Sequence, residues 1–136
     1  MRVAVALVAA CLAFAACHEE KPVGAALPRI DVTDPRYDGL VFLVATVRRS
    51  GSDFIITNDS TQPWFDVTLV LTMGGTDEYR LQLSEVDAGQ TVTASATRFA
   101  TPEGVTFDAR RIMPSTLIVS AEIGEGGPTG VYAVRL

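Results

Sequence analysis

The residues that most often carry catalysis are scarce in this chain of 136 residues. His18 is the only histidine, so the chain that follows it has no imidazole to act as a general base or a metal ligand. Cys11 and Cys17 are the only cysteines, and both lie near the N-terminus. No HExxH motif, phosphate-binding glycine loop or CxxC pair occurs. This pattern excludes Ser-His-Asp and Cys-His catalysis, and we expect no catalytic residue and no cofactor.

Carboxylates are the remaining groups that could do chemistry. Asp31, Asp34 and Asp38 lie close together, and clustered oxygen ligands suit calcium. Because Arg36 places a cation among them and the spacing is not that of an EF-hand loop, we expect a solvated linker and no metal site. Four further aspartates at turns or on polar strand faces are explained by capping and solubility: Asp59, Asp66, Asp77 and Asp87. A carboxylate-based hydrolase acting on glycans is the alternative.

Trp64 is the only tryptophan and the most suggestive single side chain for partner binding. Its parity in a strand puts it opposite Phe65, on the face that bears Asp66. An exposed tryptophan there could anchor a partner, because this residue type is enriched at the centres of interfaces. The alternative, which we favour, is that Trp64 folds over the end of the domain beside Pro63 and covers Phe54 or the preceding linker.

The N-terminal stretch is typical of a targeting segment. Arg2 supplies a positive charge, and Val3 to Ala16 form an uninterrupted apolar run. The run ends at a polar cluster that starts at His18, short of the about 20 apolar residues that span a bilayer. We therefore predict a signal peptide over residues 1–16 and no membrane-spanning helix.

The end of this segment, Phe14-Ala15-Ala16-Cys17, resembles the lipobox of bacterial lipoproteins, although Phe14 stands where that family usually has Leu. The resemblance implies that the Cys17 sulfur carries a diacylglyceryl group with palmitate-type acyl chains. It also implies that cleavage before Cys17 frees a new N-terminus, which is acylated as well. Several acyl chains, at about 0.8 kcal/mol per buried methylene, give lasting membrane attachment.

Two other processing sites stay open. Residues 8–11 also fit a lipobox, but cleavage before Cys11 would leave an apolar region of only Val3 to Leu7, whereas about 7 to 15 residues are needed. Residues 13–15 fit an ordinary A-x-A site, which would give a secreted domain without lipid. With Cys17 as the site, the next residue is not the Asp that favours inner-membrane retention. We therefore expect attachment to the periplasmic side of the outer membrane.

The charge balance bears on partners. Without Arg2 the mature chain carries sixteen acidic residues against ten basic ones, a net charge of −6. Nucleic-acid binding needs a basic stripe that neutralises phosphates, so we expect no nucleic-acid partner. The expected partners are the membrane, through the lipid anchor, and another envelope protein or polymer.

A proline-containing tether over residues 17–39 is expected to precede a folded domain over residues 40–136. The organising stretch is Asp53 to Leu71, where two apolar strands flank the turn-forming run 58–63 and are expected to pair as a hairpin. Leu40 to Arg48 is apolar on both parities, and we expect it to be a single strand.

Four more strands are expected after turns that contain polar residues or glycine: Glu78–Val86, Thr91–Phe99 with a bulge or an end near Arg98, Ser115–Ile123 and Val131–Leu136. Residues 100–114 are irregular and are expected to cross between sheets. About seven short strands without an amphipathic helix predict an all-β fold, an antiparallel immunoglobulin-like sandwich. A small closed barrel is the alternative.

Several elements between Asp53 and Phe107 resemble small bacterial envelope lipoproteins with an immunoglobulin-like sandwich of the FxLYD type. They are Ile56-Thr57-Asn58, the run Trp64 to Leu69, Tyr79, Ala88-Gly89-Gln90, Phe99 and Gly104-Val105-Thr106-Phe107. The FxLYD motif itself does not occur. The resemblance implies a fold and a location in the envelope. We therefore expect a non-catalytic, lipid-anchored envelope protein that binds or supports another envelope component.

Overall fold

The computed structural model describes residues 41–74 and 77–136, so Cys17 and the aspartates of the predicted tether lie outside the described residues. The described part contains eight strands and one short 3-10 turn. They are β1 (Val41–Phe42), β2 (Ala45–Ser50), β3 (Asp53–Asn58), β4 (Trp64–Thr72), β5 (Glu78–Val86), β6 (Thr91–Ser95), η2 (Ala96–Arg98), β7 (Thr116–Ile123) and β8 (Thr129–Arg135).

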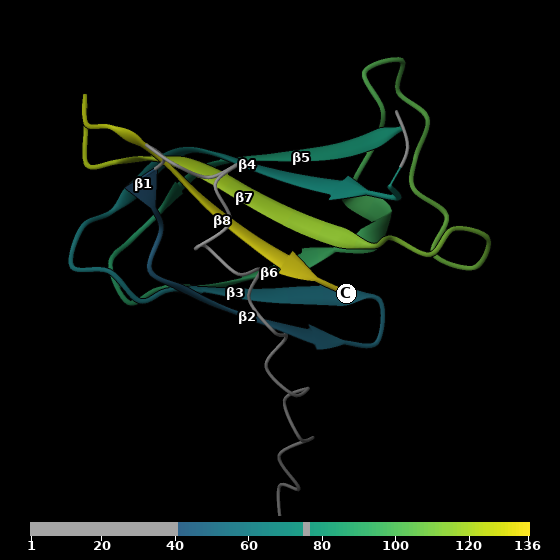
Figure 1. Cartoon of the computed structure of the whole chain (residues 1–136), viewed down its shortest axis with the longest axis horizontal. Coiled ribbons are helices and arrows are strands. Elements are labelled where there is room, and N and C mark those ends of the chain that lie inside the picture. Colours follow the sequence, from purple (N-terminus) through teal and green to yellow (C-terminus); the bar gives the residue numbers. More distant parts are fainter. Residues whose placement is uncertain (1–40, 75–76) are drawn as a thin grey trace, which may run out of the picture.

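The strands form two sheets, which Figure 1 shows as two layers. One sheet has the order β1-β8-β7-β4-β5, and the other has the order β2-β3-β6. Every pairing is antiparallel except that of β1 with β8. Apart from β1, the sandwich has seven strands. β2, β3 and β6 form one sheet, and β4, β5, β7 and β8 form the other. This is the arrangement of immunoglobulin-like sandwiches in which the fourth of the seven strands, here β5, joins the second sheet. The predicted all-β sandwich is confirmed.

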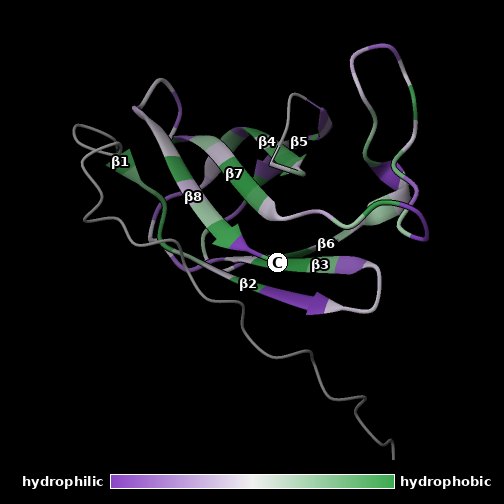
Figure 2. Cartoon of the chain, turned by 45° about the vertical axis from the view of Figure 1, so that its right-hand side comes forward, coloured by the Kyte–Doolittle hydropathy of each residue, from purple (hydrophilic) through white to green (hydrophobic). Residues whose placement is uncertain are grey.

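The core lies between the sheets, and alternation along the strands fills it. In β5 the predicted inward residues Tyr79 and Leu81 are buried, and in β7 the inward Leu117 and Val119 are fully buried. Both strands are half-buried with one solvated face, which is the situation in which a period of two is easiest to detect. Figure 2 shows the resulting bands of hydrophobic and hydrophilic residues along the strands.

The stretch predicted as one strand from Leu40 to Arg48 is two strands in different sheets. β1 pairs with β8, and β2 pairs with β3. Leu43 lies between them, is buried, and donates its backbone N–H to Val131 O at 3.0 Å. A Cβ at Gly130 would lie 2.6 Å from Leu43 Cδ2, so the glycine makes room for this crossing. Successive residues are apolar in this stretch because the chain passes from one sheet to the other.

The predicted hairpin from Asp53 to Leu71 is wrong. β3 and β4 are both present, but β3 lies between β2 and β6 while β4 lies between β7 and β5. The turn-forming residues 59–63 therefore cross from one sheet to the other. Turn composition marks where a strand ends, but it does not determine which sheet the next strand joins.

The predicted face of Trp64 is also wrong. The register between β4 and β7 shifts between Phe65 and Thr68, and Asp66 has a positive φ of 47°. This bulge adds a residue to β4, so Trp64 and Val67 both face the core and both are buried, whereas Phe65 is only half-buried. Aspartate is one of the few residue types that tolerate this backbone region.

The connection after β6 closes one end of the sandwich. β6 ends at Ser95, η2 follows, and Phe99 is fully buried against Phe54 with ring centroids 6.0 Å apart. The early strand end explains why Phe99 breaks the parity of residues 91–97. Residues 99–115 then cross to β7 as predicted, and Figure 1 shows them projecting beyond the strand ends, opposite β1.

Candidate functional site: the free edge of β6

Four strands form the edges of the two sheets, and three of them carry features that discourage pairing with another chain. β1 has only two residues, β2 carries Arg48 and Arg49, and β5 carries charged side chains at Glu78, Arg80 and Glu85. Short length and charge are the usual protection of an exposed edge. β6, with the sequence TVTAS, carries no charge and no proline. Figure 2 shows the contrast with β2, whose second half is strongly hydrophilic.

The backbone of β6 offers hydrogen-bonding groups on its free side. Asn58 donates its backbone N–H to Gln90 O at 3.0 Å, and Ala96 donates to Ser52 O at 3.1 Å, which fixes the hydrogen-bonded pairs between β3 and β6. In an antiparallel ladder these pairs alternate, so the N–H and C=O groups of Val92 and Ala94 point to β3. Those of Thr91, Thr93 and Ser95 therefore point away from the sheet, and no strand of the described part pairs with them.

Apolar side chains border this edge. Val92 of β6 and Leu83 of β5 both pack against the core but are only partly buried. β5 and β6 follow one another in the chain, and each is an edge strand of its sheet, on the same side of the sandwich. A chain that paired with β6 would add its inward side chains to this partly covered region. The outward face of β6 is hydroxyl-rich, with Thr91 Oγ1 2.9 Å from Thr57 Oγ1.

Asn58 fixes the position of β6 relative to its neighbours. It is the one buried polar side chain of the described residues, and its Nδ2 donates to Gln62 O at 2.9 Å and Val86 O at 3.1 Å. Its Oδ1 accepts from the Ser60 N–H at 3.0 Å, and its backbone C=O accepts from the Gly89 N–H at 2.8 Å. The Asn58 side chain thus joins β3 to the crossing segment and to the end of β5, and its backbone joins β3 to the turn before β6.

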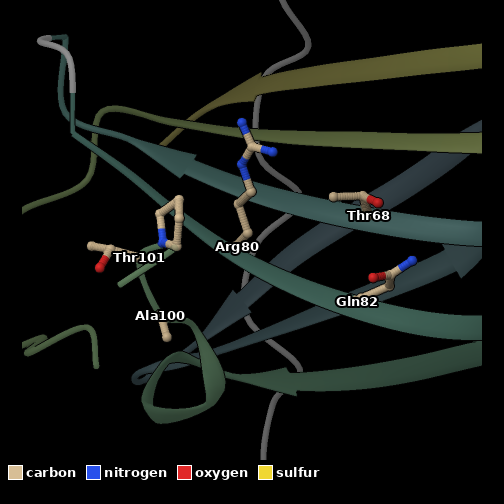
Figure 3. Close-up of a pocket in the computed structure, with 6 residues that line it drawn as sticks. Thr68, Arg80, Gln82, Ala100 and Thr101 are labelled. Atoms are coloured by element: carbon tan, nitrogen blue, oxygen red, sulfur yellow. The ribbon is translucent and has the colours of Figure 1, made fainter. Parts of the chain in front are cut away.

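The edge of β5 differs because the chain already covers part of it. Arg80 and Ala100 exchange two backbone hydrogen bonds, at 2.8 and 3.1 Å, and Ala100 also pairs with Thr106. Beside this bridge lies a shallow pocket of about 400 Å³, lined by Thr68, Arg80, Gln82, Ala100, Thr101 and Pro102. Figure 3 shows that its polar side chains come from β4, β5 and the segment after Phe99.

The pocket offers hydrogen-bonding side chains but no histidine, cysteine or carboxylate. Its one cation, the Arg80 guanidinium, is half-exposed and already paired with Glu78 Oε2 at 2.7 Å. Such exposed pairs contribute little binding energy. We therefore take the edge of β6, and not this pocket, as the candidate site.

The residues singled out from the sequence lie elsewhere. Trp64 is fully buried, so it is not a surface anchor, and its Nε1 has no hydrogen-bond partner. The four aspartates considered above are each exposed: Asp59, Asp66, Asp77 and Asp87. Over residues 41–74 and 77–136, no group of three or more potential ligands is placed to hold a metal ion. No helix in this part of the chain is long and apolar enough to cross a membrane.

The sequence contains a signal for the β6 edge that residue-by-residue reasoning missed. Thr91 to Thr97, TVTASAT, alternates hydroxyl and apolar residues without a charge, and this stretch contains the whole of β6. An uncharged strand is unremarkable in the centre of a sheet, so the signal acquires meaning only once the topology places the strand at an edge. Comparisons with protein-family models, curated proteins and solved structures give no match to this chain.

Proposed function

We propose that this chain is a lipid-anchored protein of the bacterial cell envelope, attached through Cys17 on the periplasmic side. Its sandwich binds an extended polypeptide segment of another envelope component, which adds as a strand to the free edge of β6. The anchor is supported by the apolar run before Cys17 and by the two small residues that precede it. The binding mode is supported by the uncharged edge whose backbone groups have no strand partner in the described sandwich.

Strand addition needs three properties, and β6 has each of them. The backbone groups of Thr91, Thr93 and Ser95 are directed outward, which supplies main-chain hydrogen bonds for affinity. No charge must be desolvated when the partner arrives. The strand is held by β3 over its full length, so little ordering cost falls on the protein itself.

The neighbouring side chains indicate which segment would fit. Residues of the added strand that point inward would contact Val92 and Leu83, so apolar residues suit those positions. The alternate residues would lie beside Thr91 and Thr93 on the solvated face, where small hydroxyl side chains pair well across strands. We therefore expect a proline-free segment in which apolar and small polar residues alternate.

The Thr93→Pro variant tests this proposal. The Thr93 N–H points away from β3, so proline removes a donor used by the partner and no donor used by the sheet. The variant should fold and reach the membrane in normal amounts but should not restore the envelope phenotype of a strain that lacks the gene. Phenotype, membrane abundance and thermal unfolding would be measured together.

Arg49→Pro is the matched control on the opposite edge. Asp59 donates its N–H to Val44 O, a register that leaves the Arg49 N–H pointing away from β3 as well. This variant should restore the phenotype fully. Full restoration by a well-folded Thr93→Pro protein would rule out strand addition at β6.

A further inference from the structure

The charges of the sandwich are segregated between its two ends. One end, here called the acidic end, contains the connections 59–63, 87–90 and 124–128 and the strand residues next to them. The other, the loop end, contains the turn at 51–52, the connection 96–115 and the last residues of β8. The acidic end and the strand halves next to it carry six carboxylates and no cation in the described chain: Asp59, Asp66, Glu85, Asp87, Glu122 and Glu125.

Every arginine of the described chain belongs to the loop-end half. The seven arginines of this half are Arg48, Arg49, Arg80, Arg98, Arg110, Arg111 and Arg135. Its five carboxylates are Asp53, Asp77, Glu78, Glu103 and Asp108, so the net side-chain charge of this half is +2. Three of the arginines, Arg98, Arg110 and Arg111, belong to the connection between β6 and β7 and are exposed. The Arg111 side chain is 86% exposed, although its Nε lies 3.5 Å from Asp108 Oδ2.

The same connection carries exposed apolar side chains. Val105 is 59% exposed and Met113 is 79% exposed, and both belong to segments that project from the loop end in Figure 1. Val105 follows Gly104, which has a φ of 86° and forms the tip of a turn closed by the Gly104 N–H and Thr101 O. Exposed apolar side chains on projecting segments, in a connection that also carries exposed arginines, combine the two features that bind proteins to the interface of an anionic bilayer.

We propose that the loop end docks on an anionic phospholipid surface, with Val105 and Met113 entering the interface and Arg110 and Arg111 contacting phosphate groups. The acidic end is repelled by the same surface, so the charge distribution orients the whole domain. A membrane fits these features better than an acidic protein, because Val105 and Met113 are the only large apolar side chains exposed at the loop end of the described chain. This inference concerns a different surface from β6 and does not depend on strand addition.

The chain before β1 is long enough to permit this orientation. Because β1 begins at the acidic end, a lipid on Cys17 would be linked to the end that points away from the membrane. About 20 residues separate Cys17 from β1 and reach roughly 70 Å when extended. A nine-residue strand such as β4 is only about 30 Å long, so the connection can pass the full length of the sandwich.

The test uses the full chain with an environment-sensitive fluorophore on a cysteine at position 113, in the variant Met113→Cys. The protein is reconstituted into vesicles of phosphatidylcholine alone or of phosphatidylcholine with phosphatidylglycerol. The unmutated chain, treated with the same label, measures labelling of the native cysteines. We expect a blue shift and stronger emission only with phosphatidylglycerol, and we expect added salt to reverse the change.

Two comparisons decide the result. Ala88→Cys places the label in an exposed turn of the acidic end and should show no shift. Replacing Arg110 and Arg111 with Gln in the Met113→Cys chain should abolish the shift, whereas the same change at Arg48 and Arg49 should preserve it. An equal shift at both label positions, no shift with phosphatidylglycerol, or a shift unaffected by Arg110→Gln with Arg111→Gln would overturn the proposal. A shift produced by soluble polyglutamate but by neither vesicle would also overturn it and point to an acidic macromolecule.

Discussion

Asn58 shows how a single polar side chain can determine the arrangement of several strands. Because it is completely buried, each of its polar atoms must find a partner, and its amide does so on two carbonyls and two donors of Ser60. These contacts join the end of β3 to Gln62 and to Val86 at the end of β5. The Asn58 side chain therefore holds the end of β5, and the Asn58 backbone bonds the turn that leads into β6.

Replacing Asn58 with Ala should lower the free energy of unfolding by about 2 to 4 kcal/mol, because Val86 O and the Ser60 N–H lose their buried partner. The neighbouring Asp59→Ala is the matched comparison. It removes an exposed hydrogen bond that Thr46 Oγ1 donates, and should cost about 1 kcal/mol or less. Urea unfolding of the two variants measures both values. Equal costs would mean that the Asn58 network does not hold the crossing together.

Residue-level prediction failed at Trp64 for a definite reason. The prediction assumes that successive side chains of a strand alternate strictly between its two faces. The bulge at Phe65 and Asp66 breaks this alternation. The sequence contains a weak cue, because aspartate tolerates a positive φ. Most aspartates nevertheless have a negative φ, so the residue type alone does not predict a bulge. The burial of Trp64 agrees with the preferred expectation that it serves the fold, but its place inside the core was not predicted.

At the scale of elements, strands with one solvated face were predicted well. β5 has the predicted bounds, and the predicted strands at β7 and β8 agree with the structure to within two residues. The pairing of strands was predicted less well, because the choice of sheet depends on which apolar faces meet in three dimensions. The turn at Gly51 and Ser52 joins two paired strands, whereas the runs 59–63 and 87–90, with similar composition, join different sheets.

The register of β4 leads to a prediction about its two faces. Leu69 is fully buried, and Leu69→Ala should cost about 2 to 5 kcal/mol through lost burial and the remaining cavity. Thr68 points to the opposite face and lines the shallow pocket, so Thr68→Ala should cost about 0.5 kcal/mol or less. Thermal or urea unfolding measures the difference. Similar costs for both changes would contradict the register of β4 beyond the bulge.

For the whole molecule, the strand order of the two open sheets creates the candidate site. The order β2-β3-β6 leaves β6 as an edge strand. Ala100 covers part of the neighbouring β5 edge, whereas no strand of the described residues pairs with the outer side of β6. Neither feature can be derived from composition or periodicity, because both arise from topology. The charge difference between the ends has the same origin, since it follows from which connections meet at each end.

Site-specific photo-crosslinking along β6 in the native membrane tests whether a partner strand adds to this edge. A photoreactive amino acid is placed in the full chain at Thr91, Thr93 or Ser95, and at Thr46 on β2 as the control. Strand addition predicts that the three β6 positions capture one segment of one partner, at residues about two positions apart and in consecutive order, because the added strand has the same repeat as β6. Thr46 should capture nothing from that segment. Absence of capture along β6, or capture of scattered partner residues without this order, would contradict the account.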